Sequence, residues 1–237
     1  HFTAYHALHQ VAKVRAGDEL DIEKLEKFFG EHVPELRGAI QVEQFPKGHS
    51  NLTYLLRIGE REVVLRRPPP GAKTIKAGHD MGREYRVLTR LRGVYPKVPR
   101  ALFFCEEERS PLGVAFYVME RVRGVILRKR APEGVELGPE VMGRLSRSAV
   151  DNLVTLHGLD YRAAGLGDFG KPEGYTRRQV EGWTERYKAA KTDDIAEMEG
   201  LARWLLDNTP KDPGAAVTHN DYKSDNLVLD PKELPNI

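Results

Sequence analysis

The most constraining feature of the sequence is a series of three short apolar segments between residues 40 and 67. The segments read IQVEQF, LTYLLRI and EVVLRR, and the turn-forming stretches PKGHSN and GER separate them. Such segments are typical of strands, and the short connections favour antiparallel hairpins. Two further strands are predicted at ALFFC and VAFYVME, on either side of the polar segment EEERSPLG. The pattern therefore predicts a five-stranded antiparallel sheet.

Helical spacing of apolar residues dominates the rest of the chain. It predicts a helix over residues 21–33, one internal helix in HDMGREYRVLTRLRG after the stiff loop RRPPPGAK, and helices over residues 141–157, 179–188 and 195–206. We therefore predict an α+β fold with two lobes. The expected parts are an amino-terminal helical extension (1–39), a sheet lobe (40–121) and a helical lobe (122–237).

Composition narrows the classes of partner. The 237 residues include 37 basic and 35 acidic side chains, a net charge of +2, which gives no global basic field for nucleic acid. No apolar stretch approaches the roughly 20 residues that span a bilayer, so no membrane partner is expected. The single cysteine, Cys105, cannot form an intramolecular disulfide, which favours a reducing, cytoplasmic setting. The oligomeric state stays open.

The segment VTHNDYKSDNLVLD, residues 217–230, gathers polar side chains between apolar pairs. His219, Asp221 and Asn226 stand at the spacing His-x-Asp-x-x-x-x-Asn. In the catalytic loop of kinases this spacing places an Asp at the acceptor hydroxyl and an Asn on magnesium. The alternative is that the Asp and the Asn cap turns.

The internal helix contains an acidic residue on its apolar side. Glu84 lies three residues after a Met and four before a Leu, so it shares the stripe that should face the core. A buried carboxylate requires a cation, and Arg66 or Arg67 of the preceding strand could supply it from opposite faces of the sheet. Kinases use such a pair to hold nucleotide phosphates. The alternative is a solvated Glu84 paired with Arg83 or Arg86.

Two weaker signals accompany these residues. The turn in FPKGHSNLTYLL offers Gly48, Ser50 and Asn51, which suit a loop over phosphates but equally an ordinary hairpin turn. The strand FYVMERVRG could present its backbone to a flat base, or be plain core.

Five basic residues could meet nucleic-acid phosphates, but apolar residues interrupt them and a solvated face is more typical. They are Arg121, Arg123, Arg128, Lys129 and Arg130.

Taken in order, these parts resemble the aminoglycoside phosphotransferase and choline kinase-like family, which has a protein-kinase-like fold. The resemblance covers nearly all of residues 42–237. Within that family, the chain looks most similar to the phosphotransferase-like domains fused to acyl-CoA dehydrogenases. The segments that carry this similarity are SNLTYLLR, VVLRRPPPG, REYRVL, FYVMERVRG, RRQVEGW and HNDYKSDNLV.

The resemblance implies a role for each matching position. The implied catalytic, metal and loop-supporting residues are Asp221, Asn226 and His219. The implied nucleotide-binding residues of the sheet lobe are Gly48, His49, Ser50, Asn51, Arg66, Glu84, Met119, the Glu120 carbonyl and the Val122 amide. A second metal-binding Asp is expected beyond Ile237, which implies that the helical lobe is incomplete at its carboxy-terminal end.

The sequence departs from the family pattern at two further positions. Arg66 replaces the usual Lys, and an Arg still supplies a permanent forked charge for phosphate oxygens. Asn220 replaces the usual Gly between His219 and Asp221, and Asn tolerates the unusual backbone angles that Gly serves there. The resemblance thus implies ATP- and magnesium-dependent transfer of the γ-phosphate to a small-molecule hydroxyl, with a hydroxy acid or hydroxyacyl compound as acceptor. The alternative is a nucleotide-binding pseudokinase or scaffold domain.

Overall fold

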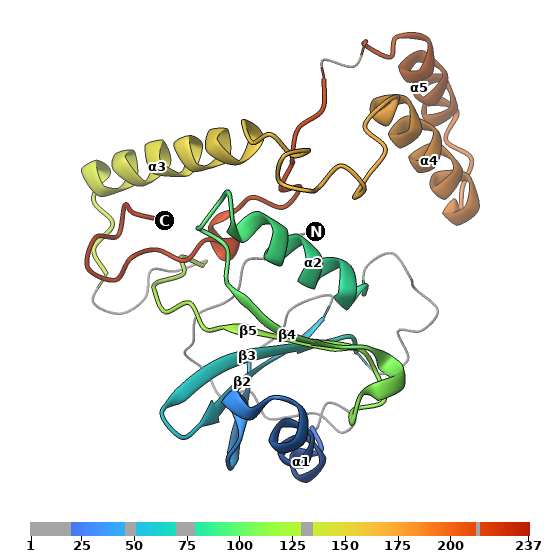
Figure 1. The fold of residues 1–237 in the computed structure, drawn as a ribbon. Coiled ribbons are helices and arrows are strands. Elements are labelled where there is room, and N and C mark those ends of the chain that lie inside the picture. The colour runs from blue at the N-terminus through green and yellow to red at the C-terminus, as the bar shows by residue number, and fades with distance from the viewer. Residues whose placement is uncertain (1–19, 46–50, 70–78, 129–134, 212–213) are drawn as a thin grey trace. The chain divides into compact units, whose positions relative to one another are not determined.

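The computed structural model describes residues 20–45, 51–69, 79–128, 135–211 and 214–237 (Figure 1). The chain divides into two compact units, His1–His157 with Thr218–Ile237, and Gly158–Val217. The predicted boundary between a sheet lobe and a helical lobe, at residues 121/122, falls inside the first unit and stays a prediction.

The first unit contains the predicted five-stranded antiparallel sheet. The strand order is β1-β2-β3-β5-β4, and all four pairings are antiparallel. Gly59, with a φ of 59°, supplies the left-handed residue of the tight turn between β2 and β3. The strand bounds are β1 Ile40–Gln44, β2 Leu52–Ile58, β3 Arg61–Arg67, β4 Ala101–Cys105 and β5 Phe116–Glu120.

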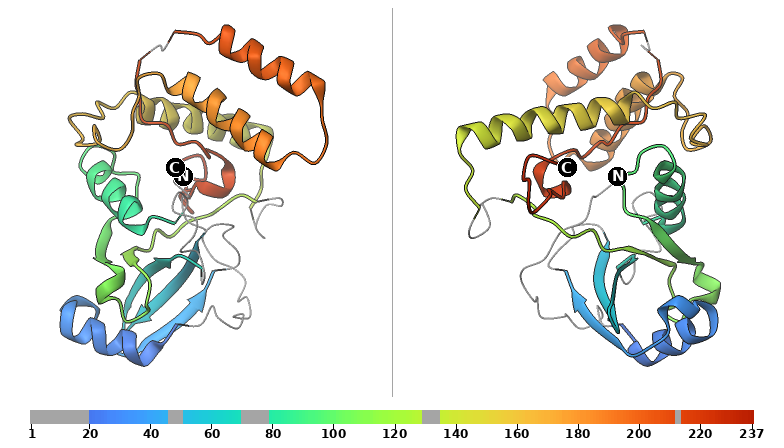
Figure 2. Two further views of the ribbon diagram at one scale, coloured as in Figure 1. Left: turned by 90° about the vertical axis from the view of Figure 1, so that its right-hand side faces the viewer. Right: turned by 60° about the vertical axis from the view of Figure 1, so that its left-hand side comes forward.

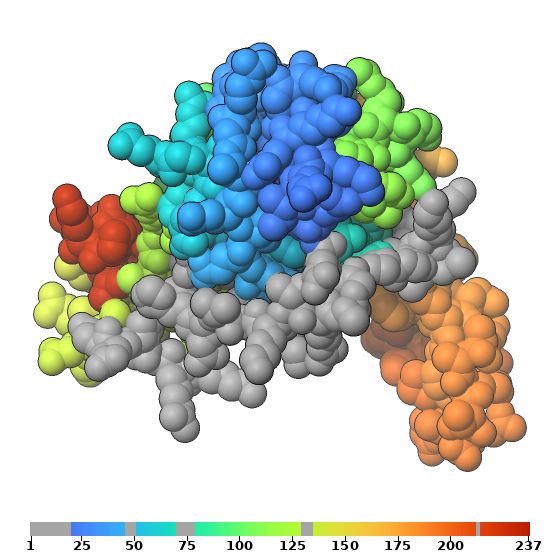
Figure 3. All heavy atoms as spheres, turned by 90° about the horizontal axis from the view of Figure 1, so that it is seen from below, coloured from blue at the N-terminus to red at the C-terminus, as the bar shows by residue number. Residues whose placement is uncertain are grey.

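Helix α1, Ile22–His32, covers one face of the sheet. Asp21 caps it by accepting a hydrogen bond from the backbone N–H of Lys24 at 3.1 Å. Leu25 and Phe29 are fully buried against the sheet residues that point to this face. Figure 3, which views this side, shows the blue surface of α1 and β1 between the cyan surface of β2 and β3 and the green surface of the chain around β4. On this face, α1 and the sheet form one hydrophobic cluster.

Helix α2, Met81–Arg92, covers the opposite face, as the ribbon views of Figures 1 and 2 agree. Asp80 caps it through a 2.7 Å hydrogen bond from the backbone N–H of Arg83. Its apolar stripe packs on the alternate residues of the central strands. The buried members of this cluster are Phe45, Leu55, Val64, Met81, Leu88, Tyr117 and Met119. The strand positions that face α2 therefore also face the candidate site.

The remaining helices follow the predictions closely. Helix α3, Pro139–His157, belongs to the first unit, and two short 3-10 turns, η1 Pro34–Leu36 and η3 Glu107–Arg109, connect elements of the sheet region. In the second unit, α4 Tyr175–Ala190 and α5 Ala196–Asp207 pack against each other. Of the helices in the described ranges, none has both the length and the apolar character needed to cross a membrane.

Replacing Phe29 tests how strongly α1 holds the sheet. Phe29→Ala should lower the free energy of unfolding by about 3–5 kcal/mol, because it removes a fully buried ring from the centre of the packing face. Ile22→Ala is the control, since Ile22 starts the same helix but is 37% exposed, and a change within about 1 kcal/mol is expected. Urea denaturation of both variants measures the difference. Equal losses would contradict this packing.

Candidate active site

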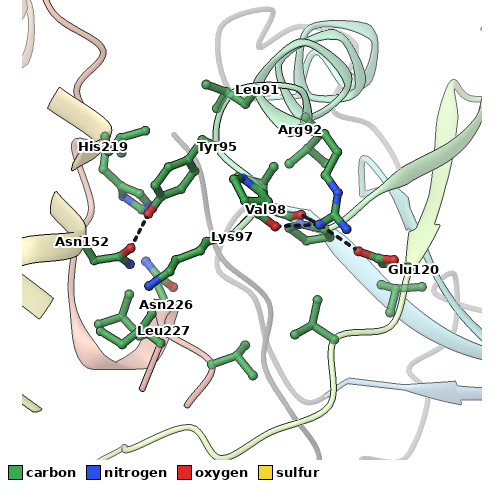
Figure 4. A pocket seen from close by; sticks show the side chains of 18 of the residues that line it. Leu91, Arg92, Tyr95, Lys97, Val98, Glu120, Asn152, His219, Asn226 and Leu227 are labelled. Atoms are coloured by element: carbon green, nitrogen blue, oxygen red, sulfur yellow. Dashed lines mark hydrogen bonds and ion pairs between the residues drawn. The ribbon is translucent and has the colours of Figure 1, made fainter. Parts of the chain in front are cut away.

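A cavity of about 300 Å³ lies between the α2 face of the sheet, helix α3 and the segment Thr218–Ile237. All residues that line it belong to the first unit. Phe45, Val64, Val122, Leu227 and Val228 give it apolar walls. Figure 4 shows Glu120 on one side and His219 and Asn226 on another. A flat apolar group with polar substituents at one end would fit such a space.

Asn226 is the most informative residue of the cavity wall. The 3-10 turn η4, Ser224–Asn226, carries it, and its side chain is almost fully buried, at 1% exposure. Its Nδ2 donates to both the backbone oxygen and Oδ2 of Asp221, each at 2.8 Å. Its Oδ1 is buried and accepts no hydrogen bond from any described residue. A buried amide oxygen left over in this way is a suitable ligand for a hard cation such as magnesium.

Asp221 is fixed by the residues beside it in the same loop. Its Oδ2 accepts from Asn226, and its Oδ1 lies 3.0 Å from Nζ of Lys223. Burial by itself would raise the pKa of Asp221, but the hydrogen bonds from Lys223 and Asn226 together hold that pKa below its ordinary value. Asp221 is therefore an anion at neutral pH, with its side chain 34% exposed.

The two residues before Asp221 shape the loop. Asn220 has a φ of 60°, the one non-glycine residue in the left-handed region among those described, so the substitution of Asn for the expected Gly preserves the backbone conformation. His219 accepts a weak hydrogen bond on Nδ1 from the backbone N–H of Asp221, at 3.4 Å. Burial lowers the pKa of His219, which agrees with a neutral ring that accepts at this nitrogen.

The structure resolves which strand arginine faces Glu84. Arg66 Nη1 lies 3.3 Å from Glu84 Oε2, and the Arg66 side chain is only 4% exposed. Arg67 points to the α1 face, where its Nη2 donates to the Tyr54 hydroxyl at 3.2 Å and its guanidinium lies over the Tyr54 ring. The hydroxyl of Tyr117 donates to Glu84 Oε2 at 2.9 Å, and Asn51 Nδ2 donates to Oε1 at 2.9 Å. The Glu84 carboxylate, whose side chain is 19% exposed, thus has three donors.

The segment after β5 is held by ion pairs on both sides. The Glu120 carboxylate accepts from the backbone N–H of Arg100 at 2.8 Å and pairs with Arg92 at 3.4 Å, as Figure 4 shows in part. Glu62 pairs with both Arg121 and Arg123. Burial alone would raise the pKa of Glu62, but these guanidinium groups hold its pKa below the ordinary value. Two members of the basic series are therefore neutralised within the chain.

Sequence reasoning missed a polar bridge between the end of α2 and the loop that contains Asp221. Tyr95 donates to Asn152 Oδ1 at 2.8 Å, a contact visible in Figure 4, and Asn152 Nδ2 lies 3.4 Å from the Tyr222 hydroxyl. Tyr222 in turn donates to the backbone oxygen of Ala149 at 2.9 Å. Asn152 is only 5% exposed on the inner side of α3. A polar residue in an apolar helical stripe, the signal that singled out Glu84, could have found it.

The predicted site residues fall into three groups. Glu84, Glu120, Val122, His219 and Asn226 line the cavity. A second group lies directly behind the lining residues. Arg66 and Asn51 contact Glu84, Asp221 accepts a hydrogen bond from Asn226, and Met119 is buried in the core directly before Glu120. Gly48, His49 and Ser50 lie outside the described residues. Among the described residues, no cluster of three His, Cys, Asp or Glu side chains could hold a metal.

Gly124 lies where the segment after β5 approaches the segment after Asn226. Val125 and Leu229 exchange two backbone hydrogen bonds, of 2.9 and 2.8 Å, in an isolated antiparallel bridge. A Cβ at Gly124 would overlap the backbone oxygen of Leu229 and the side chain of Val228. The absence of a side chain at Gly124 is therefore what lets these two walls of the cavity meet.

The protein-kinase-like arrangement of sheet, α2 and loop has counterparts among known proteins. Residues 41–235 match the "Phosphotransferase enzyme family". A Ralstonia eutropha JMP134 structure, assigned by its name to the aminoglycoside phosphotransferases, has a TM-score of 0.75 and 37% identity over 91% of this chain and 62% of that one. The streptomycin-ATP-APH(2")-IIa ternary complex has a TM-score of 0.59 and 17% identity over 91% and 69%, a likeness of fold alone. The chain therefore belongs to the phosphotransferase enzyme family.

The sequence relatives come from a second group of names. Acyl-CoA dehydrogenase family member 11 of Rattus norvegicus is 38% identical over 220 residues, which are 91% of this chain and 28% of the relative. Acyl-CoA dehydrogenase family member 10 of Mus musculus is 34% identical over 83% of this chain and 18% of the relative. The chain thus spans under a third of the length of the curated relatives it matches.

Substitution of Gly124 should disturb the cavity through the backbone. Gly124→Ala should lower the free energy of unfolding by about 1–3 kcal/mol, because the new methyl group overlaps backbone that has to move. Gly143→Ala in α3 is the control: a Cβ there meets nothing within 4 Å, and a helix-interior Gly→Ala change should leave stability equal or raise it by up to about 1 kcal/mol. Thermal and urea unfolding report both. Loss of the same size in both variants would contradict the close approach.

Proposed function

We propose that this chain provides the nucleotide site and the catalytic loop of an ATP- and magnesium-dependent phosphotransferase that phosphorylates a hydroxyl group of a small molecule. The observation that carries the proposal is the Asn226 side chain, which binds Asp221 through its Nδ2 and leaves a buried Oδ1 at the cavity wall. A turn-capping Asn or Asp would instead direct its side chain to nearby backbone donors. The family membership supports transfer to a small molecule.

The nucleotide would bind between the sheet and the loop. The apolar walls suit the base, with the backbone at Glu120 and Val122 offering hydrogen bonds to its edge. Arg66, held by Glu84, supplies a permanent cation for the phosphates. A family neighbour that binds ATP together with streptomycin supports this assignment of the two ligands.

Asp221 would act on the acceptor. Its carboxylate is ionised and positioned by Asn226 and Lys223, so it can orient the hydroxyl and accept its proton. In the balanced reaction, the acceptor oxygen forms a bond to the γ-phosphorus, the bond from that phosphorus to the β–γ bridging oxygen breaks, and ADP leaves. Positioning supplies most of the rate, because the protein forms no covalent intermediate.

Magnesium, when bound, would neutralise phosphate charge, and Asn226 Oδ1 is the ligand that this chain offers it. A carboxylate beyond Ile237 is the expected second ligand. For the acceptor we favour a hydroxy acid or a hydroxyacyl compound over an antibiotic, because the relatives of 34–38% identity carry acyl-CoA dehydrogenase names. A cytoplasmic setting is part of the same proposal.

The role of Asp221 is tested in the full-length protein by ATP turnover with hydroxy acids as acceptors. Asp221→Asn should reduce kcat by about 100- to 10,000-fold, because the amide cannot accept the proton of the hydroxyl. Binding of ATP should change little, since Arg66 and the cavity walls are untouched. A coupled ADP-release assay measures kcat, and calorimetry measures ATP affinity.

Asp230→Asn is the matched control. Asp230 is an exposed carboxylate of the same segment whose Oδ1 accepts from the backbone N–H groups of Lys232 and Glu233, so its loss should leave turnover near the wild-type value. Equal turnover in Asp221→Asn and wild type would remove Asp221 from the mechanism. ATP binding by the wild type without any turnover would favour the pseudokinase.

A further inference from the structure

Glu84 is held by more than the strand cation. The salt bridge to Arg66 uses one oxygen, Oε2, at 3.3 Å. The same oxygen accepts the Tyr117 hydroxyl at 2.9 Å, and the other oxygen accepts Asn51 Nδ2 at 2.9 Å. The hydrogen bonds from the two neutral donors are therefore shorter than the N–O distance of the ion pair. A glutamate has three side-chain torsions, so these donors decide where its carboxylate stands when no phosphate is bound.

The donors come from adjacent positions in the sheet. Tyr117 on β5 is the register partner of Arg66 on β3, so both side chains rise from the same face, side by side. Asn51 immediately precedes β2, whose Thr53 is the register partner of Arg66 on the other side. Two groups from the strands on either side of β3 thus flank the Arg66–Glu84 pair, Tyr117 on β5 and Asn51 directly before β2.

The orientation of the Asn51 amide follows from its partners. Glu84 accepts only, so Nδ2 of Asn51 faces it and Oδ1 faces Nδ1 of His79, 2.7 Å away. His79 directly precedes Asp80, the residue that caps α2. The same amide therefore ties the beginning of α2 to the beginning of β2, which fixes Glu84 along the helix as well as across the sheet.

Tyr117 suits this task because it stays protonated. Its ring is fully buried, and burial raises the pKa of its hydroxyl well above the ordinary value. The hydroxyl therefore remains a donor at neutral pH. Tyr117 also lines the cavity together with Glu84, so the contact is at the site and not remote from it.

We propose that Tyr117 and Asn51 are positioning residues that clamp Glu84 and, through it, hold Arg66 ready for nucleotide phosphates before the nucleotide arrives. This inference rests on the proposed nucleotide-binding function. It assigns Asn51 to the support of Glu84 rather than to direct phosphate contact. It also adds Tyr117, whose position in an apolar strand suggests only a core residue.

The test compares two buried tyrosines on opposite faces of one sheet. In Tyr117→Phe, the affinity of the full-length protein for ATP with magnesium should fall about 10-fold, because the carboxylate loses one of its two neutral anchors. In Tyr54→Phe, the lost hydroxyl belongs to Arg67 on the α1 face, and ATP affinity should stay within about 2-fold of wild type. Both tyrosines are at most 1% exposed. Both variants should therefore lose a similar amount of stability in thermal unfolding.

A double-mutant cycle separates positioning from general weakening. If Tyr117 acts through Glu84, Tyr117→Phe should have no further effect on ATP affinity in a Glu84→Ala background. Should Tyr117→Phe fail to unfold cooperatively, Asn51→Ala replaces it in the comparison, because it removes the donor to the other carboxylate oxygen of Glu84. Equal ATP affinity in Tyr117→Phe and Tyr54→Phe overturns the clamp.

The same series distinguishes failure of the clamp from failure of the proposed function. ATP binding by wild type that weakens in Arg66→Met, but not in Tyr117→Phe or Asn51→Ala, overturns the clamp and leaves the nucleotide site standing. Absence of ATP binding by the wild-type protein overturns both. A loss of about 10-fold in the Tyr117 and Asn51 variants, together with weakened binding in Arg66→Met and near-wild-type binding in Tyr54→Phe, supports the clamp.

Discussion

The ion pair between the buried Arg66 and the partly buried Glu84 is the interaction on which the rest of the site depends. Removing one partner would leave an uncompensated charge in the core, which is far more costly than the pair is favourable. This asymmetry fixes the register of β3, because a slip of one residue would exchange Arg66 for Arg67 and turn every neighbouring side chain to the wrong face. It also fixes the rotation of α2 about its axis, since Glu84 has to point at the sheet.

The two arginines of β3 show how differently one strand can accommodate a cation. Arg67 is 6% exposed and is met by the hydroxyl and the ring of Tyr54. Those neutral groups solvate a charge without opposing it. Arg66 is met by a carboxylate that itself lines the cavity. A cation held by an anion at a cavity edge is placed to bind a phosphate there, whereas Arg67 packs against Tyr54 on the α1 face of the sheet.

The local sequence pattern determined most of the elements but not their three-dimensional partners. Short apolar segments between turn-forming stretches predicted all five strands, and helical spacing of apolar residues predicted α1 and α2. Whether Arg66 or Arg67 meets Glu84 depends on which face α2 covers, and no local pattern specifies that. Tyr117 escaped notice because a tyrosine in an apolar strand looks like any core ring until its hydroxyl partner is known. Asn152 carried a usable signal, a polar side chain between Leu145 and Leu156 at helical spacing.

The choice of an amide at position 226 follows from two demands on one side chain. The group next to the Asp221 carboxylate has to donate, and Nδ2 does so twice. The group at the cavity has to accept, and Oδ1 is available for that. A carboxylate at this position would repel Asp221 and raise its pKa, which would weaken it as an anion at neutral pH. A lysine could donate but would offer nothing to a cation. The amide satisfies both demands because it carries a donor and an acceptor on one planar group, so the same residue can orient the acidic side chain and present an oxygen to the proposed magnesium ion.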